Sequence, residues 1–204
     1  MFGDERRFSK KDWRTRVRSI LSQIEESELV KKSELVSNNL LTLFDKNLAF
    51  DKLFPPVGED FFIGGFAPLK DEPNWLLCLE EVFNGFIAFP GVNKPGGMAF
   101  FEADRSDLVL TKSFGAPILT PPPNSLIVLP KFILVPGLAF GEDGSRLGRG
   151  KGFYDKYLEG FSGFKIGVCF SEQVFEALPM EPNDKFVDFV VTDKNIFGPR
   201  ENLD

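Results

Sequence analysis

The stretch from Phe132 to Leu158, FILVPGLAFGEDGSRLGRGKGFYDKYL, joins an apolar run, a glycine-rich loop and an amphipathic segment. In the loop, glycines alternate with cations, in the order Arg146, Gly148, Arg149, Gly150, Lys151 and Gly152. Glycines leave backbone N–H groups uncovered, and the interleaved cations favour a strongly anionic ligand such as a polyphosphate. Ligands of parallel sheets bind at the carboxyl ends of strands, so an apolar strand followed by this loop predicts a polyphosphate site.

Outward from this stretch, apolar strands alternate with helices along the chain. We expect strands over residues 61–65, 85–90, 98–104, 132–137, 164–170 and 187–193, and helices over 10–26, 28–44, 73–83, 152–158 and 171–179. The Pro-rich passage GAPILTPPPNS, residues 115–125, is expected to cross the surface without regular structure. This order predicts an α/β protein of the three-layer αβα type, with a mostly parallel sheet and helices on both faces. The 204 residues fit a single domain spanning 1–204.

The first predicted helix carries a basic edge. Ser9 and Asp12 form a capping-box-like start, and apolar side chains recur with helical spacing after them. Lys10, Arg14 and Arg18 are four residues apart and therefore line one edge of this helix. Two interpretations stay open, a solvated helix face or a source of phosphate-binding side chains for a nearby site.

The composition excludes several kinds of chemistry. There is no histidine, so histidine-based triads, histidine metal sites and imidazole acid–base catalysis are excluded. Cys78 and Cys169 form no CxxC pair, which argues against a zinc site or a disulfide framework and suits a reducing cytosol. We expect a cytoplasmic protein without a membrane span, because the start lacks a signal-peptide pattern and Lys131 and prolines interrupt the most apolar region.

Charge is distributed unevenly. Residues 1–18 carry seven Lys or Arg against three Asp or Glu, a local +4, and the chain as a whole carries −6, which leaves −10 on the rest. A basic arm can bind nucleic acid, but an acidic body would repel a duplex. We therefore expect no nucleic-acid partner.

The glycine loop matches neither of two common nucleotide motifs. A Walker A loop needs a glycine where Ser145 stands and a Ser or Thr where Gly152 stands, and the dinucleotide fingerprint needs a third glycine at Phe153. Asp155, just beyond the loop, has two readings. It is either a ligand that holds Mg²⁺ against a phosphate or an acid that stabilises the start of a helix.

The string LVPGLAFGEDGSRLGRGKGFYDKYL closely resembles the signature of the 5-formyltetrahydrofolate cyclo-ligases, also called methenyltetrahydrofolate synthetases. Three further segments look like this family: SKKDWR near the start, GGFAPLKDEPNW around Glu72, and KIGVCFSEQVFEALPMEPNDKFVDFVVTD near the end. The resemblance covers most of residues 10–193, and the stretch 91–131 matches least. It implies the NagB/RpiA/CoA-transferase-like version of the αβα fold.

The resemblance implies a ligase that forms a C–N bond. In the family, ATP phosphorylates the formyl oxygen of 5-formyltetrahydrofolate, the neighbouring folate nitrogen attacks the activated carbon, and phosphate leaves to give 5,10-methenyltetrahydrofolate and ADP. Phosphorylation is needed because an amide-like formyl group is a poor electrophile with a poor leaving group, and phosphoryl transfer depends mainly on positioning and charge stabilisation. We expect ATP and Mg²⁺ as cofactors, and a monomer that acts on this small-molecule substrate.

Roles for single residues follow from the positions that match the family's motifs. Lys10 and Arg14 are expected to reach the ATP phosphates, and the expected nucleotide loop is Arg146, Leu147, Gly148, Arg149, Gly150, Lys151, Gly152, Phe153 and Tyr154. Arg149 and Lys151 are the expected catalytic cations, which balance charge that moves during transfer. The expected folate contacts are Glu72, Phe66, Arg149, Gly150, Lys151, Gly152 and Phe153, with Glu72 accepting hydrogen bonds from the pterin. Asp155 and Asp188 are the expected metal ligands.

Departures from the family pattern keep alternatives open. Gly141 stands where Asp is common, Lys131 where an acid is usual and Phe153 where Tyr is usual, and the segment FPGVNKPGG, residues 89–97, lacks an arginine often found there. One alternative is a paralogue that binds ATP and acts on another small substrate without cyclising formyl-folate. Another is a nucleic-acid-binding module built on the first helix, which the acidic body disfavours.

Overall fold

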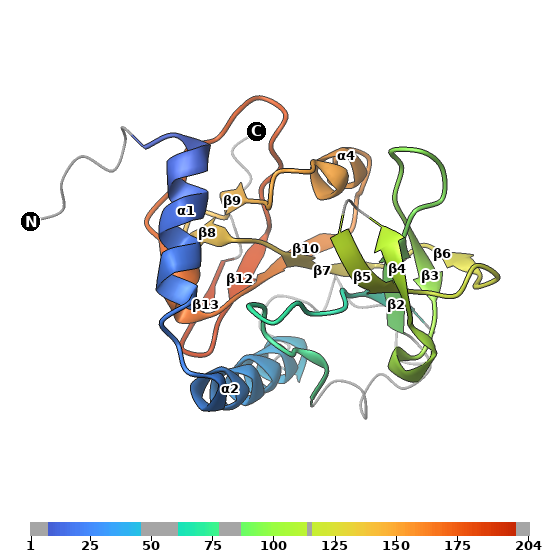
Figure 1. The fold of residues 1–204 in the computed structure, drawn as a ribbon, viewed down its shortest axis with the longest axis horizontal. Coiled ribbons are helices and arrows are strands. Elements are labelled where there is room, and N and C mark those ends of the chain that lie inside the picture. The colour runs from blue at the N-terminus through green and yellow to red at the C-terminus, as the bar shows by residue number, and fades with distance from the viewer. Residues whose placement is uncertain (1–7, 46–60, 78–86, 114–115, 199–204) are drawn as a thin grey trace, which may run out of the picture.

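The computed structural model describes residues 8–45, 61–77, 87–113 and 116–198 (Figure 1). Within these ranges, eight strands form a central sheet in the order β13-β12-β10-β7-β1-β2-β3-β6. Their bounds are β1 Ile63–Gly64, β2 Ile87–Gly91, β3 Ala99–Glu102, β6 Ile127–Val128, β7 Phe132–Pro136, β10 Phe164–Val168, β12 Phe189–Val191 and β13 Ile196–Phe197, and the helices are α1 Lys10–Leu21, α2 Glu26–Asp45 and α4 Phe153–Glu159. The strands from β12 to β2 run parallel, whereas β13 and β3, which flank them, run in the opposite direction, and the edge strand β6 pairs antiparallel with β3. The prediction of a mostly parallel sheet is confirmed.

Helices cover opposite faces of this sheet, with α2 below it and α4 above it in Figure 1. Side chains alternate along β7: Phe132 and Leu134 pack in the core beneath α2, whereas Ile133 and Val135 pack in the core beneath α4. All four are fully buried, as a strand covered on both faces requires. The predicted αβα layers are therefore present, and the narrower likeness to NagB/RpiA/CoA-transferase-like folds stays a prediction.

The first helix packs on a second, smaller sheet of three strands, which have the order β11-β8-β9 and the bounds Val174–Phe175, Ala139–Gly141 and Arg146–Leu147. The α1 side chains Trp13, Val17 and Leu21 share a buried core with Leu138 and Leu147. The predicted capping box is present at the start of this helix. Because β9 ends where the glycine loop begins, this core fixes α1 beside the loop.

The Pro-rich passage is a strand, which contradicts the prediction. β5 (Ala116–Thr120) pairs antiparallel with β4 (Val109–Ser113) in a two-stranded sheet. Such a pair has an outer edge on each strand, where Pro117 can stand without breaking a ladder of hydrogen bonds. The run of prolines at 121–123 follows the strand directly.

The predicted helix over 171–179 is also wrong. The segment forms a single 3₁₀ turn (Ser171–Gln173) followed by the short strand β11. Gln173 accounts for this, because its buried side chain donates to the carbonyls of Gly137 and Leu138 and accepts the Phe170 N–H. These tertiary bonds hold the segment extended against the strand that leads into the glycine loop.

Other boundaries differ less. The first helix ends at Leu21 instead of residue 26, and the second begins at Glu26. Most of the predicted helix over 73–83 lies outside the described residues, as does Cys78. The short edge strand β13 was not predicted. Among the described helices, none combines the length and apolarity needed to cross a membrane.

Candidate functional site

A cavity of about 230 Å³ opens at the carboxyl ends of the parallel strands. Its walls include Pro90 in β2, Pro136 at the end of β7, Phe66 and Glu72 from the segment after β1, and residues 148–155 of the glycine loop and α4. The lining is mostly apolar, and the polar groups come chiefly from Glu72 and the loop. A preformed concave pocket therefore lies where the sequence predicts a ligand site, at the carboxyl ends of the strands.

The glycine loop takes backbone conformations that side chains disfavour. Gly150 has φ +101° and Gly152, which precedes α4, has φ +69°, both in the left-handed region. Arg14 reaches over from α1, and its Nε donates to the carbonyl of Gly148 at 2.9 Å. A Cβ on Gly150 would stand 3.6 Å from the Arg14 guanidinium carbon, so the loop passes directly under this side chain. The positive φ values therefore account for glycine at both positions, since a Cβ at Gly150 would make only an ordinary contact with Arg14.

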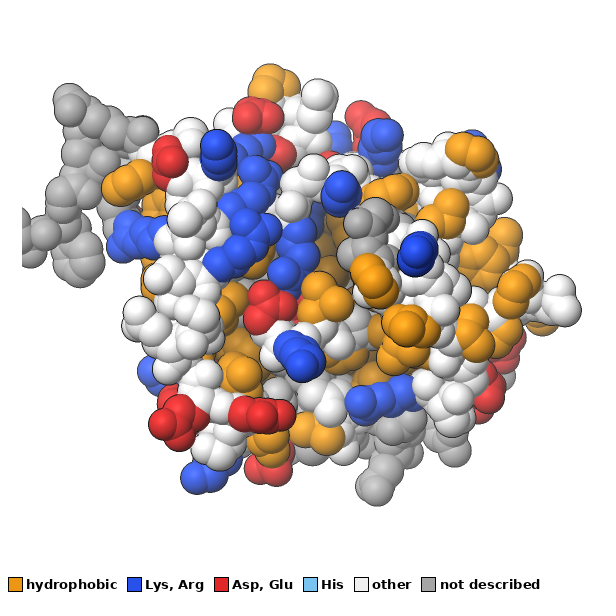
Figure 2. Space-filling view, viewed as in Figure 1, with side chains coloured by type: hydrophobic (Ala, Val, Ile, Leu, Met, Phe, Trp, Pro, Cys, Tyr) orange, Lys and Arg blue, Asp and Glu red, His pale blue; other side chains and the backbone are white. Residues whose placement is uncertain are grey.

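The basic edge of the first helix divides into three different environments. Lys10 pairs with Asp184 and, at 3.2 Å, with Glu181. Arg14 contacts the loop, whereas Arg18 is exposed. Figure 2 shows Lys and Arg side chains gathered in a band between α1 and α4. Of the two readings left open for this edge, the contact of Arg14 with the loop favours a contribution to the site.

Arg146 lies under the loop instead of projecting from it. Its Nη1 donates to the carbonyl of Pro136 at 3.2 Å and its Nη2 to Asp155 Oδ1 at 2.5 Å. The side chain is 3% exposed, and its guanidinium stands over the ring of Tyr154. The side chain of Leu147 is buried in the core beneath α1, so of this residue the backbone alone faces the loop.

Arg149 is held by two carboxylates. Its Nε donates to Glu72 Oε1 at 2.9 Å, and its Nη1 and Nη2 donate to the two oxygens of Asp71 at 3.1 and 2.7 Å. Glu72 also accepts the backbone N–H of Leu69 at 3.0 Å. Burial raises the pKa of Glu72 above its ordinary value, and the Arg149 guanidinium opposes that shift in part. Lys151, the other expected catalytic cation, is exposed at the cavity wall.

Two buried polar atoms at this cavity lack a hydrogen-bond partner within the described ranges. They are the hydroxyl of Tyr154 and Nε of Arg146. The Tyr154 residue is partly exposed, but its hydroxyl is enclosed, and this burial raises the pKa of the phenol. Buried polar groups in native proteins are nearly always paired, so these two atoms are candidate contacts for a polar ligand.

Asp188 is a correction to the expected metal ligands. Its Oδ2 accepts the backbone N–H of Lys165 at 2.8 Å and its Oδ1 pairs with Lys165 Nζ at 3.4 Å. Lys165 and Asp188 stand at the amino ends of the parallel strands β10 and β12, whereas the cavity lies at the carboxyl ends, on the opposite side of the sheet. Asp188 and Asp155 are therefore not brought together.

Sequence reasoning missed the acids that do contact the site's cations. Asp184 stands beside Lys10, and Asp71 binds Arg149. The segment NDKFVDF contains two acids four residues apart, and the apolar run after the second one marks it as the start of a strand, which could have directed attention to Asp184. Within the described ranges, no group of three or more Cys, Asp and Glu side chains could by itself hold a metal ion.

Comparison with known proteins gives one consistent result. The model of the 5-formyltetrahydrofolate cyclo-ligase family matches residues 80–193. A mouse 5-formyltetrahydrofolate cyclo-ligase is 40% identical over 152 residues, which cover 62% of this chain and 70% of that protein. A probable 5-formyltetrahydrofolate cyclo-ligase from Schizosaccharomyces pombe is 37% identical over 79 residues, which are 32% of this chain and only 39% of that protein.

Among solved structures, the NMR structure of Aquifex aeolicus 5,10-methenyltetrahydrofolate synthetase superimposes with a TM-score of 0.75. It is 30% identical in sequence, and the match covers 96% of this chain and 95% of that one. The likeness therefore extends over nearly the whole chain.

Proposed function

The chain belongs to the 5-formyltetrahydrofolate cyclo-ligase family, and on this premise we propose that it converts 5-formyltetrahydrofolate and ATP to 5,10-methenyltetrahydrofolate, ADP and phosphate. The observation that carries the proposal is the cavity at the carboxyl ends of the strands, where an apolar slot, the Glu72 carboxylate and the cationic glycine loop meet. A flat apolar ring with polar edges fits the slot, and a polyphosphate fits the loop.

For the nucleotide, we propose that Lys10, Arg14 and the loop from Arg146 to Tyr154 bind the phosphates. The left-handed glycines leave backbone N–H groups uncovered, and Arg14 already rests on the loop through Gly148. Arg146 would support the loop from beneath, because its side chain is buried and bonded to Asp155. Leu147 would contribute through its backbone.

For the folate, the proposed contacts are the acid Glu72, the rings of Phe66 and Phe153, and the segment from Arg149 to Gly152, all of which line the cavity. A carboxylate with two oxygens can accept the paired N–H donors of a pterin. Phe66 is buried and Phe153 is partly exposed, so the two rings offer apolar walls to a flat ligand.

The chemical role of the chain is to position the reactants and to balance charge. Phosphorylation of the formyl oxygen turns a poor leaving group into phosphate, and negative charge moves between the two ligands during the transfer. Arg149 and Lys151, at the wall of the cavity, are the side chains that would stabilise this charge.

A metal ion fits this site only in part. Mg²⁺ is commonly held by one or two carboxylates together with phosphate oxygens, and it neutralises phosphate charge. Asp155 lies in the cavity with one oxygen on Arg146, which suits one such ligand, whereas Asp188 lies at the opposite edge. We propose Asp155, which lines the cavity beside the glycine loop, as the protein ligand.

At the level of the whole molecule, we propose one domain over residues 1–204 that works as a cytoplasmic monomer on a small-molecule substrate. The strands β7, β8 and β12 each contribute side chains to two of the three buried cores of the described residues, which supports a single folding unit. The described thiol, Cys169, is buried and free, as suits a reducing compartment.

The test is a spectrophotometric assay at slightly acid pH, in which the near-ultraviolet absorption of the methenyl product is followed after mixing protein, 5-formyltetrahydrofolate and Mg-ATP. We expect a rise that requires ATP and that Lys151→Ala abolishes. Lys156→Ala is the matched control, because it removes an equal, exposed charge that does not line the cavity. ATP binding without any product would refute the proposal and support the paralogue that acts on another substrate.

A further inference from the structure

Arg149 carries one positive charge and is bound by two negative ones. Asp71 receives both terminal nitrogens of its guanidinium, and Glu72 receives Nε. A guanidinium has five N–H donors, so these contacts use three and leave two. In this arrangement the charge of Arg149 is already more than neutralised.

The two acids differ sharply in their access to water. The side chain of Glu72 is 5% exposed, whereas that of Asp71 is 35% exposed. Separating Arg149 from Glu72 would leave a carboxylate buried without a countercharge, which is strongly unfavourable. Separating Arg149 from Asp71 releases a partly exposed carboxylate that water can solvate, which costs less than leaving the Glu72 carboxylate buried and unpaired.

The two acids also bind different edges of the planar guanidinium, and only one of these edges suits a phosphate. Asp71 holds the terminal fork of Arg149, which is the part that best matches the paired oxygens of a phosphate. Glu72 holds only the Nε edge. A phosphate that approaches along the glycine loop and engages the fork must therefore compete with Asp71 and can leave the Glu72 contact in place.

We infer that Asp71 is a positioning residue of this site, which holds the fork of Arg149 in the ligand-free protein and yields it to the phosphates of the nucleotide. The inference rests on the proposed function, since it requires a phosphate ligand on the glycine loop. Glu72 is the fixed arm of the pair and Asp71 the exchangeable one. Arg149 keeps its Nε bond to Glu72 in both states, while its terminal fork passes from Asp71 to the phosphates.

We therefore expect that removing the negative charge of Asp71 strengthens nucleotide binding. In Asp71→Asn the competing charge is gone while the volume is kept, so the dissociation constant for Mg-ATP is expected to fall about threefold to tenfold. The measurement is isothermal titration calorimetry on the whole chain with Mg-ATP and no folate, so that binding is read without turnover.

Two controls isolate the effect. Asp104→Asn removes the same charge from an exposed position at the start of the 3₁₀ turn Arg105–Asp107, and it is expected to leave the dissociation constant unchanged. In a background of Arg149→Met, Asp71→Asn should also have no effect, because Asp71 acts through the guanidinium. Steady-state kinetics then separate this role from a general structural one: Asp71→Asn lowers KM for ATP and leaves KM for 5-formyltetrahydrofolate unchanged.

The outcomes are distinguishable. If the wild-type protein binds Mg-ATP and Asp71→Asn binds it equally or more weakly, the inference is overturned and the proposed function stands. If the gain persists without Arg149, or if Asp104→Asn produces the same gain, the effect is a general one of surface charge and the inference is again overturned. If neither the wild type nor Asp71→Asn binds Mg-ATP, the proposed function and the inference both fail.

Discussion

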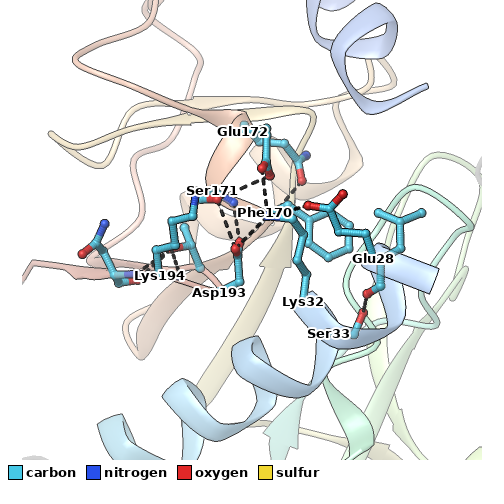
Figure 3. A network of polar contacts seen from close by, with 12 residues as sticks. Glu28, Lys32, Ser33, Phe170, Ser171, Glu172, Asp193 and Lys194 are labelled. Carbon is cyan, nitrogen blue, oxygen red and sulfur yellow. Dashed lines mark hydrogen bonds and ion pairs between the residues drawn. The ribbon is translucent and has the colours of Figure 1, made fainter. Parts of the chain in front are cut away.

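Replacing Lys32 by methionine tests how the molecule holds its second helix to the sheet. Lys32 projects from α2, and its Nζ donates to Glu172 Oε1 at 2.8 Å and to Asp193 Oδ2 at 2.9 Å (Figure 3). The side chains of Lys32 and Asp193 are 8% and 2% exposed. Asp193 also accepts the backbone N–H of Ser171 at 2.7 Å, so this cluster joins α2 to the segments that follow β10 and β12.

Methionine keeps most of the apolar stem of Lys32 and removes the charge. Asp193 is then buried without its countercharge, and breaking a buried pair in this way costs about 3–5 kcal/mol. We expect the lower end, about 3 kcal/mol, because the N–H and hydroxyl of Ser171 still bind Asp193. For a chain of this size the melting temperature should fall by about 6–12 °C.

The assay is urea denaturation followed by tryptophan fluorescence, together with calorimetric melting. Trp13 and Trp75 are buried in different cores, so a single fluorescence transition in urea, together with equal calorimetric and van't Hoff enthalpies on heating, would support a two-state analysis. Lys31→Met is the matched control, because Lys31 is exposed on the same helix. A loss below about 1 kcal/mol, or one no larger than that of the control, would refute the reasoning.

The dependence of this effect on pH follows from the pKa of Lys32. Burial lowers that pKa, but the hydrogen bonds to Glu172 and Asp193 outweigh burial, and the net shift is upward from 10.5. A base whose pKa is raised by folding contributes stability that is fully present below its unfolded pKa and is lost as the pH rises through the folded one. The stability gap between wild type and Lys32→Met should therefore stay constant from neutral pH to about 10 and narrow above it.

Two further substitutions test local features of the site region. Gly141→Asp, which restores the residue common in the family, should destabilise the protein by about 2 kcal/mol or more in urea denaturation, because a Cβ there would collide with Ser145 and Asp143 and stand 3.1 Å from the backbone of Ala177. Tyr154→Phe should leave the free energy of unfolding within about 0.5 kcal/mol of wild type, because the hydroxyl has no partner in the described protein, yet it should raise KM for a substrate in the methenyl assay. Destabilisation by Tyr154→Phe without a kinetic effect would contradict the view of its hydroxyl as a ligand contact.

Much of the fold could be predicted because its strands are nearly continuous apolar runs. The run at 132–136 has every residue buried or nearly so, which is the pattern of a strand covered on both faces. The errors arose where tertiary contacts decide the local structure. Gln173 draws a helix-like segment into an extended one through bonds to carbonyls 35 and 36 residues away, and no local pattern encodes such a contact.

The site was predicted in part for a similar reason. Motif matching brought Phe66, Glu72 and the glycine loop together, since these positions carry recognisable residue types in sequence. It did not identify Asp71 as a partner of Arg149, because the two residues are 78 positions apart and the sequence does not distinguish Asp71 from an ordinary surface acid. The expectation for Asp188 came from the resemblance to the family, and a motif match does not tell at which end of the strands an acid lies.

Two clusters in this molecule have the same charges and different consequences. Lys32 with Glu172 and Asp193, and Arg149 with Asp71 and Glu72, each place one cation between two acids. Both follow the carboxyl ends of strands, but the cation is 8% exposed in the first cluster and 28% exposed in the second. Because solvent access sets the free energy of separating a pair, the first cluster is suited to fixing α2.

The second cluster can exchange one of its acids for a ligand. Its cation lies in a cavity, its terminal fork faces the more exposed acid, and its buried acid keeps a separate bond to the backbone of Leu69. Exchange of Asp71 for phosphate therefore leaves no buried charge unpaired at any step. The same would not hold for Lys32, because its release from Asp193 would leave a carboxylate unpaired that is only 2% accessible to water. Solvent exposure, more than charge or position in the sheet, thus separates the part of this fold that can respond to a ligand from the part that cannot.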